Sequence, residues 1–270
     1  MEFKVDNLRG GYVSVVQDVL AYGEHVTVRG QGTTELLSAS VTLTDPLDAL
    51  PLHVGRRLNP AIAAVEAAQL ISGRSHPDLM CRISQNFRQF MDGGTFHAPY
   101  GPRITAQISS VLRRLRDDPF TRQAVITIWD PALDQQEGYH DYPCTLSLQF
   151  LIRRGKLDMQ VHMRSNDVWR GLAYDAFQFT QLQASIARYL HVPLGVYRHH
   201  AASLHLYDSD QDAAMEMIAL HRGRDDLGSS PEGPTGLTVQ QARDLLNGQR
   251  VAVPDSSTEW YAAALAPYFV

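Results

Sequence analysis

Two apolar runs, 145–153 and 156–162, stand side by side in the sequence and are joined by the turn Arg154-Gly155. Adjacent strand-like runs with a glycine turn predict a β-hairpin, and apolar spacing over 174–190 predicts a long core helix. Strands are also expected within 25–43, 124–130 and 195–210, with helices at 11–22, 60–73, 77–90, 103–116 and 210–221 and a polar loop at 131–142.

Reactive and charged side chains gather around this hairpin. Cys144 precedes its first strand, Arg164-Ser165 follow its second strand, and Asp167 and Asp175 lie just beyond. A nucleophile, an anion-binding cation and two carboxylates are thereby placed within one short segment. A cysteine in a strand is more often a packing residue than a nucleophile, so its neighbours carry the argument.

The bulk composition excludes several classes of protein. The chain has 270 residues, 24 basic and 29 acidic, and the net charge of −5 argues against a nucleic-acid groove. No segment has the apolar length of a membrane span. Two distant cysteines, Cys81 and Cys144, make no disulfide framework, which favours a cytoplasmic protein. We expect one domain over 1–270, with 223–236 as a flexible insert, and no metal site.

Two other positions stay open on residue evidence alone. Arg29 lies in the glycine-rich turn 29–32, which suits either an anion site or a plain hairpin turn. Glu66 lies in the apolar helix 60–73, where a carboxylate is costly unless it has a partner or a function; an exposed stripe on the helix is the equal alternative.

Several motifs taken together resemble the thymidylate synthase family. PCTLSLQF (143–150) is similar to the family's nucleophile motif, RSNDVWRGLAYDAF (164–177) to its RSxDxxLGxPFN signature, and HLYDSD (205–210) to its HxYxNH. DDPFTRQ (117–123) and the final APYFV (266–270) resemble two further family segments. The resemblance covers most of the chain and is strongest between 118 and 210.

The resemblance implies an α/β (α+β) fold with a mixed six-stranded sheet and flanking helices, packed against its copy in a homodimer. It also implies a reaction in which a cysteine adds to C6 of a pyrimidine nucleotide, and C5 then takes a one-carbon unit from the co-substrate 5,10-methylenetetrahydrofolate. Addition at C6 makes C5 nucleophilic, which is covalent catalysis.

Individual roles follow from the same resemblance. Cys144 becomes the nucleophile, and Glu66 with Tyr100 handles water and protons. The phosphate is assigned to Arg29, Arg164, Ser165 and, from the other subunit, Arg122; the sugar to His205 and Tyr207; the base to Asp175. The folate is assigned to Asp167, Arg56, Gly171 and Val270.

Asp175 stands where thymidylate synthases have Asn, and it meets the N3/C4 edge of the base. A carboxylate accepts from the amino group of cytosine and is repelled by O4 of uracil. The resemblance therefore points to the pyrimidine nucleotide hydroxymethylase branch and to cytidylate. Ala176 is small where synthases usually carry a larger residue, which leaves room for a 2′-hydroxyl. This favours CMP over dCMP, as in the CMP hydroxymethylases of nucleoside-antibiotic (mildiomycin) biosynthesis.

Other departures leave alternatives open. Thr145 follows the nucleophile in place of His, Gln123 replaces a second phosphate arginine, and 79–90 has no match to the family's tryptophan-rich folate wall. A dCMP hydroxymethylase, a thymidylate synthase or dUMP hydroxymethylase, and a nucleotide-binding protein without catalysis remain the rival interpretations. A cysteine hydrolase is disfavoured, because no motif places a histidine beside Cys144.

Overall fold

The computed structural model describes residues 1–51, 56–221, 236–251 and 256–269. Its strands are β1 (Glu2–Val5), β2 (Glu24–Val28), β3 (Gln31–Leu43), β4 (Met91–Asp92), β5 (Thr95–Phe96), β6 (Val125–Thr127), β7 (Thr145–Arg153), β8 (Lys156–Met163), β9 (Asn166–Asp167) and β10 (Leu194–Tyr207). Its helices are α1 (Leu8–Tyr22), α2 (Pro60–Ser72), α3 (Pro77–Ile83), α4 (Tyr100–Asp117), α5 (Pro131–Asp134), α6 (Leu172–Leu190), α7 (Gln211–His221), α8 (Val239–Leu246) and α9 (Ser256–Leu265), with 3-10 turns at 85–90, 208–210 and 266–268.

The main sheet of the described residues is mixed, with strand order β1-β3-β10-β8-β7-β6. β2 pairs with β3 and β9 with β10, outside that path. β10 runs parallel to β8 and antiparallel to β3, while β7 and β8 form the predicted hairpin. The six-stranded mixed sheet implied by the resemblance is therefore confirmed as the central path, extended by two short pairings.

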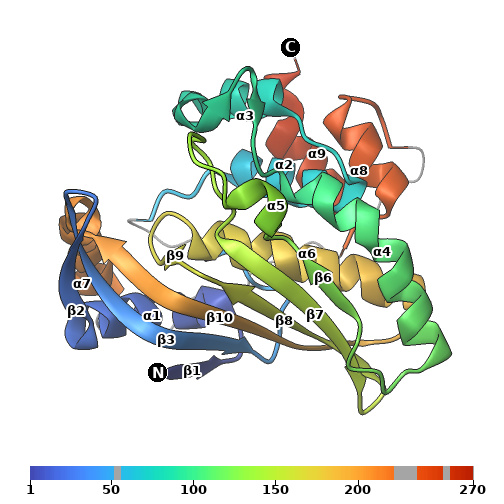
Figure 1. Cartoon of the computed structure of the whole chain (residues 1–270), viewed down its shortest axis with the longest axis horizontal. Helices are drawn as coiled ribbons and strands as arrows, with labels where there is room; N and C mark the ends of the chain where they lie inside the picture. Colours follow the sequence, from blue (N-terminus) through green and yellow to red (C-terminus); the bar gives the residue numbers. More distant parts are fainter. Residues whose placement is uncertain (52–55, 222–235, 252–255, 270) are drawn as a thin grey trace.

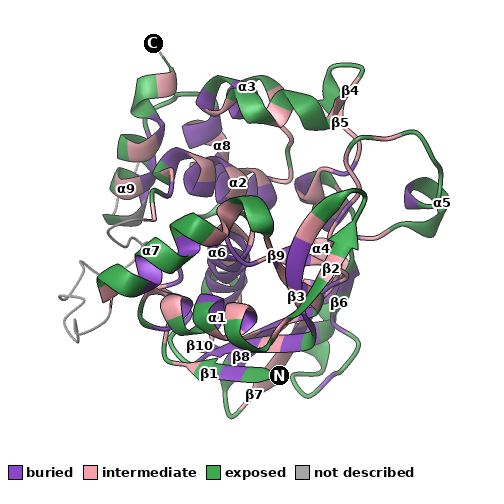
Figure 2. Ribbon diagram, turned by 90° about the vertical axis from the view of Figure 1, so that its left-hand side faces the viewer, coloured by how far each residue is buried: buried purple, intermediate pink, exposed green. Residues whose placement is uncertain are grey.

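Helix α6 lies along one face of the sheet, and α2 packs on α6 beneath the C-terminal helices α8 and α9 (Figure 1). Figure 2 shows buried residues concentrated in α2, α6 and the inner strand faces. Burying apolar surface between these layers is the main force that holds them together. The result is a floor of strands under α6, whose first turn reaches the ends of β8 and β9.

Local sequence signals explain where the central helix α2 begins and ends. The side chain of Asn59 accepts from the backbone N–H of Ala61 at 2.9 Å, and Pro60 occupies the first turn. Gly73 ends the helix with φ at 74°, a left-handed conformation that glycine adopts at little cost. The helix expected at 60–73 is confirmed.

Three expectations about local structure needed correction. The helix expected over 77–90 ends at Ile83 and continues as a 3-10 turn, and α4 begins at Tyr100 rather than at 103. The polar loop expected at 131–142 contains the short helix α5. Asp130 caps α5 by accepting from the backbone N–H of Ala132 at 2.9 Å, whereas α3 and α4 have no side-chain cap. Periodicity alone leaves helix boundaries loose. The insert expected at 223–236 lies almost entirely outside the described residues.

Within the described residues, no helix is both long and apolar enough to cross a membrane.

Candidate active site

A cavity of about 500 Å³ opens where β8, β9 and β10 end near the first turn of α6. Both acids and arginines line it, together with an apolar wall, so it suits a charged ligand with a flat ring. Of the predicted site residues, those that line the cavity are Arg29, Glu66, Tyr100, Cys144, Arg164, Ser165, Asp167, Gly171, Asp175, His205 and Tyr207.

Four predicted residues are not among its walls. Ala176 is buried in the core at 1% exposure, so its small side chain supplies no room for a sugar hydroxyl in this cavity. The Arg56 guanidinium lies 4.6 Å over the Trp169 ring, donates to its carbonyl oxygen, and does not line the cavity. Arg122 is exposed and outside it. Val270 lies outside the described residues.

The β7–β8 hairpin brings Cys144 and Arg164 together at one edge of the sheet. The Arg164 backbone N–H donates to the Cys144 carbonyl at 2.8 Å. The Arg164 side chain also holds the two residues before the cysteine. It donates from Nε to the Pro143 carbonyl at 3.0 Å and from Nη2 to the Tyr142 carbonyl at 3.2 Å. This arginine therefore positions the cysteine backbone as well as placing a positive charge beside it.

Opposing influences act on the Cys144 thiol. Burial raises the pKa of Cys144, and the nearby Arg164 and Arg29 lower it without overcoming the effect of burial. The two arginines favour the thiolate, but the thiol keeps its proton at neutral pH because burial outweighs them.

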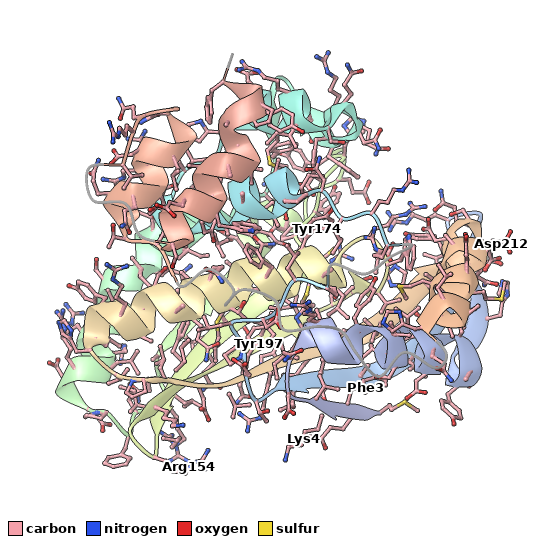
Figure 3. All side chains as sticks on the ribbon, turned by 180° about the vertical axis from the view of Figure 1, so that it is seen from behind. Phe3, Lys4, Arg154, Tyr174, Tyr197 and Asp212 are labelled. Carbon is pink, nitrogen blue, oxygen red and sulfur yellow. The ribbon has the colours of Figure 1, made fainter. Side chains whose placement is uncertain are left out.

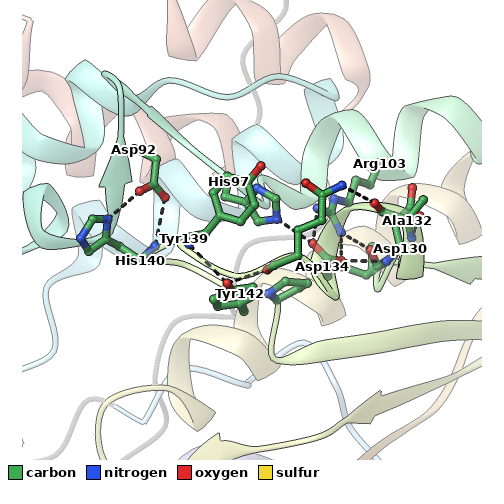
Figure 4. A network of polar contacts seen from close by, with 12 residues as sticks. Asp92, His97, Arg103, Asp130, Ala132, Asp134, Tyr139, His140 and Tyr142 are labelled. Carbon is green, nitrogen blue, oxygen red and sulfur yellow. Dashed lines mark hydrogen bonds and ion pairs between the residues drawn. The ribbon is translucent and has the colours of Figure 1, made fainter.

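A polar network anchors the loop that leads to Cys144 (Figure 4). The buried Asp134 carboxylate accepts from Arg103 at 2.5 Å and pairs with His97 at 2.9 Å. His97 stacks on Tyr139 with ring centroids 3.6 Å apart, and the Tyr142 hydroxyl donates to the Gln136 carbonyl at 2.8 Å. A buried carboxylate satisfied by this many donors stabilises one loop conformation, and that fixes where Cys144 emerges.

Asp175 stands in the first turn of α6 and faces the cavity. Its Oδ2 accepts from Asn166 Nδ2 at 2.7 Å, and its Oδ1 accepts from Gln178 Nε2 at 3.0 Å. Burial raises the pKa of Asp175 to about 6, while the two amide donors lower it. The group therefore remains mostly ionised at neutral pH.

Asp167 presents one oxygen that the described protein does not satisfy. Its Oδ1 accepts from the backbone N–H groups of Trp169 at 2.7 Å and Arg170 at 2.9 Å. Its Oδ2 is buried and accepts no hydrogen bond within the described residues, although Arg170 Nε lies 3.9 Å from it. A buried acceptor without a hydrogen bond in a cavity wall fits a ligand that offers ring N–H donors.

Glu66 projects from the apolar helix α2 into the same cavity, which favours a functional role over an exposed stripe. Its Oε2 is buried with no hydrogen-bond partner in the described residues. Burial, and to a lesser degree the charge of Asp175, raise the pKa of Glu66 to about 8. Glu66 therefore carries its proton at neutral pH and can donate it.

This pKa predicts a pH-dependent stability difference between the protein and its Glu66→Gln variant. An unfolded glutamate ionises near pH 4.5, while the folded one holds its proton to about 8. The folded state thus loses stability relative to the variant as pH rises from about 4.5 to about 8, and no further above that. We expect a relative change on the order of 2 kcal/mol, discounted for water in the cavity.

Thermal melts of both proteins between pH 5 and pH 9 measure this difference. Glu259→Gln, an exposed glutamate of helix α9, is the matched control and should show no such trend. A melting-temperature difference between Glu66→Gln and the unaltered protein that stays constant with pH contradicts the assignment.

Tyr100 is hydrogen-bonded to the backbone of Thr145, the residue that follows Cys144. Its hydroxyl oxygen accepts from the Thr145 backbone N–H at 3.3 Å, and its ring stacks on Phe179 with centroids 6.3 Å apart. Burial raises the pKa of Tyr100 well above its usual value, so the hydroxyl stays protonated. It can donate to water or substrate in the cavity.

Sequence reasoning missed residues that the structure brings to the cavity. Asn166 and Gln178 donate to Asp175, and Asp141, whose pKa burial raises to about 6, faces the same cavity. The aromatic wall is built from phenylalanines instead of tryptophans, namely Phe87, Phe90 and Phe96. Phe87 and Phe90 belong to the 79–90 segment, and their aromatic character was the available signal.

Comparisons with known proteins show what the chain is similar to. The family described as Thymidylate synthase matches residues 10–227. The chain is 31% identical over 220 residues to the deoxyuridylate hydroxymethyltransferase of Bacillus phage SP01, covering 75% of this chain and 57% of that protein. It is 30% identical over 171 residues to the protein of the same name from Pseudomonas phage M6, covering 60% and 49%.

A putative thymidylate synthase of Methanothermobacter marburgensis is 25% identical over 229 residues, covering 80% of this chain and 97% of that protein. The chain thus spans about half the length of the two phage relatives and nearly all of the archaeal one.

Proposed function

We propose that this chain, which belongs to the thymidylate synthase family, 5-hydroxymethylates a cytidine monophosphate using 5,10-methylenetetrahydrofolate. The observation that carries the proposal is the Asp175 carboxylate, held in the same cavity as Cys144 by two amide donors. The phage relatives named deoxyuridylate hydroxymethyltransferase support hydroxymethyl transfer as the reaction type.

In the first step the Cys144 thiolate adds to C6 of the base. The C5–C6 double-bond electrons move to form a C4–C5 double bond, and the displaced C4–N3 pair takes up a proton at N3. The thiol loses one proton and N3 gains one, so the step is balanced. The adduct offers Asp175 two donors, N3–H and the N4 amino group, and a carboxylate accepts both.

Methylenetetrahydrofolate supplies the one-carbon unit when it is bound. Asp167, whose Oδ2 accepts no hydrogen bond within the described residues, and the phenylalanine wall are the groups that fit a pterin ring. Glu66 and Tyr100, both protonated at neutral pH, then hold the water that completes the hydroxymethyl group. The folate nitrogen leaves the transferred carbon as C5 loses its proton, and the water oxygen then bonds to that carbon. The C5 proton and one proton of the water are taken up by the two folate nitrogens that carried the carbon. Departure of Cys144 from C6 and of the proton from N3 restores the aromatic base and the thiol.

The phosphate is proposed to lie against Arg29, Arg164 and Ser165, because guanidinium groups match phosphate oxygens. Arg122 is proposed to reach the phosphate of a second copy in a homodimer, since it is exposed and outside its own cavity. His205 and Tyr207 are proposed to bind the sugar. Arg56, Gly171 and Val270 remain proposed folate contacts.

CMP is preferred over dCMP in this proposal on the resemblance alone, because Ala176 does not line the cavity. A second candidate is dUMP hydroxymethylation, which the names of the phage relatives favour. In that case Asp175 has to be protonated to donate to O4 of uracil.

The test is a product assay with CMP, dCMP and dUMP supplied separately with methylenetetrahydrofolate. We expect CMP to be converted fastest to a product heavier by one CH₂O unit, with tetrahydrofolate and no dihydrofolate formed. A reaction without folate is the control. Fastest turnover of dUMP, or formation of dihydrofolate, contradicts the proposal.

A further inference from the structure

A line of hydrogen bonds runs from the protein core to the base-reading Asp175. The Tyr197 hydroxyl lies 2.8 Å from His199 Nδ1, and His199 Nε2 lies 3.1 Å from Asn166 Oδ1. Asn166 Nδ2 then donates to Asp175 Oδ2 at 2.7 Å. We call Tyr197, His199 and Asn166 the relay.

The hydrogen bond from Asn166 to Asp175 determines where the protons lie along the relay. Because the Asn166 amide donates to Asp175, the Asn166 oxygen faces His199 and must accept. His199 therefore carries its proton on Nε2, and Nδ1 accepts from the Tyr197 hydroxyl. Every bond of the relay points toward Asp175.

The relay is buried and has no alternative state near neutral pH. Tyr197, His199 and Asn166 are 0%, 1% and 3% exposed, and Tyr197 lies on β10 under helix α6 (Figure 3). Burial, and to a lesser degree the neighbouring His200 and His162, lower the pKa of His199 to about 3, so it stays neutral. Aligned bonds in a buried chain strengthen one another.

The absence of a side chain at Gly171 leaves room for the hydrogen bond between Asn166 and Asp175. A Cβ at this position would lie 2.9 Å from Asn166 Nδ2 and 3.2 Å from Asp175 Oδ2. Any larger residue therefore presses on the Asn166–Asp175 contact. Glycine lets β9 and α6 approach closely enough for the bond to form.

The relay and Gln178 together give Asp175 two donors and no acceptor. A proton on Asp175 would therefore find no hydrogen-bond acceptor among these protein partners. The ionised carboxylate thus faces the cavity as a hydrogen-bond acceptor. The C6 adduct of cytosine offers donors at both N3 and N4. Uracil offers N3–H and the acceptor O4, which needs a proton on Asp175.

We infer that Tyr197, His199 and Asn166 are positioning residues that hold Asp175 in its acceptor form and so exclude uracil from the site. The inference rests on the proposed cytidylate function and adds a specificity mechanism to it. The other titratable groups facing Asp175 are Glu66 of α2, Tyr100 of α4, Cys144 before β7 and Asp167 of β9. None of these donates a hydrogen bond to Asp175 in the described structure, whereas the relay does.

The experiment compares kcat/KM for cytidylate and uridylate between pH 5 and pH 8.5. The variants are His199→Gln and Asn166→Ala, with Tyr197→Phe as the mildest change in case the others fold poorly. His200→Gln is the matched control, because it is the adjacent histidine of β10 and stacks on His162 instead of joining the relay. Circular dichroism checks the fold of each protein.

In the unaltered protein we expect uridylate to gain on cytidylate as pH falls through about 6, where Asp175 takes up a proton. His199→Gln and Asn166→Ala should lower the cytidylate-to-uridylate ratio at pH 7.5 by about tenfold, and Tyr197→Phe by about threefold. Each relay variant should also raise the pH at which uridylate begins to gain on cytidylate. His200→Gln should change neither that pH nor the cytidylate-to-uridylate ratio.

Two failures can be told apart. An unaltered protein that does not prefer cytidylate at pH 7.5 overturns the proposed function and this inference with it. A protein that prefers cytidylate, with relay variants that lose activity on both bases equally at an unmoved pH, overturns the inference alone, because that is the result of a purely structural role.

Discussion

Cys144→Ser is expected to lower turnover of the pyrimidine nucleotide by at least about 10⁴-fold, because removal of an enzyme's nucleophile removes the reaction path itself. A serine hydroxyl is far harder to ionise than a thiol and adds poorly to C6 of a pyrimidine. The substitution leaves Arg164 in place, together with the hydrogen bond from its backbone N–H to the carbonyl of residue 144. Binding of CMP should therefore change by no more than about threefold.

Steady-state turnover and calorimetric CMP binding measure the two expectations separately. Cys81→Ser is the matched control: the other cysteine is buried beside Met91, with the sulfur atoms 3.2 Å apart, and does not line the cavity. It should retain activity. Equal, negligible turnover by the unaltered protein and Cys144→Ser, with tight CMP binding by both, would favour a nucleotide-binding protein without catalysis.

Asp175→Asn is expected to shift the preference from cytidylate toward uridylate by about 100-fold or more in relative kcat/KM. An asparagine offers one donor and one acceptor, which match O4 and N3–H of uracil. The surroundings can adapt to it. Asn166 can still donate to the retained oxygen, and the Gln178 amide can turn over to accept from the new amide group.

Relative turnover of CMP, dCMP, UMP and dUMP by the two proteins checks this prediction. Asp141→Asn provides a matched control, because Asp141 also lines the cavity and burial also raises its pKa to about 6. Its substitution should leave base preference unchanged. An unchanged cytidylate-to-uridylate ratio in Asp175→Asn counts against a base-reading role for Asp175.

Much of the candidate site could be predicted because its residues lie at the ends of elements that are easy to recognise. Cys144 and Arg164 flank a hairpin, and strand pairing leaves the two ends of a hairpin side by side. Glu66 stands out in an apolar helix for a related reason: hydrophobic patterning makes an acid in that helix conspicuous.

The roles of Asn166, Gln178 and His199 could not be predicted in the same way. A polar residue in the sequence does not reveal which neighbour its amide or ring will meet. His199 and Asn166 are 33 positions apart, and the packing of the folded chain brings their side chains within 3.1 Å of each other. Ala176 shows the opposite error, since a position next to Asp175 on a helix points in another direction, here into the core.

The sequence alone determined the α/β architecture, the hairpin that carries Cys144 and the carboxylate at 175, because these depend on periodicity, turn residues and family motifs within short segments. The tertiary structure was needed to establish what surrounds that carboxylate. Its two amide donors, the buried relay behind Asn166 and the close approach allowed by Gly171 arise where β9, β10 and α6 pack together. The direction of a hydrogen bond depends on which partners packing supplies, and no local pattern in the chain encodes that.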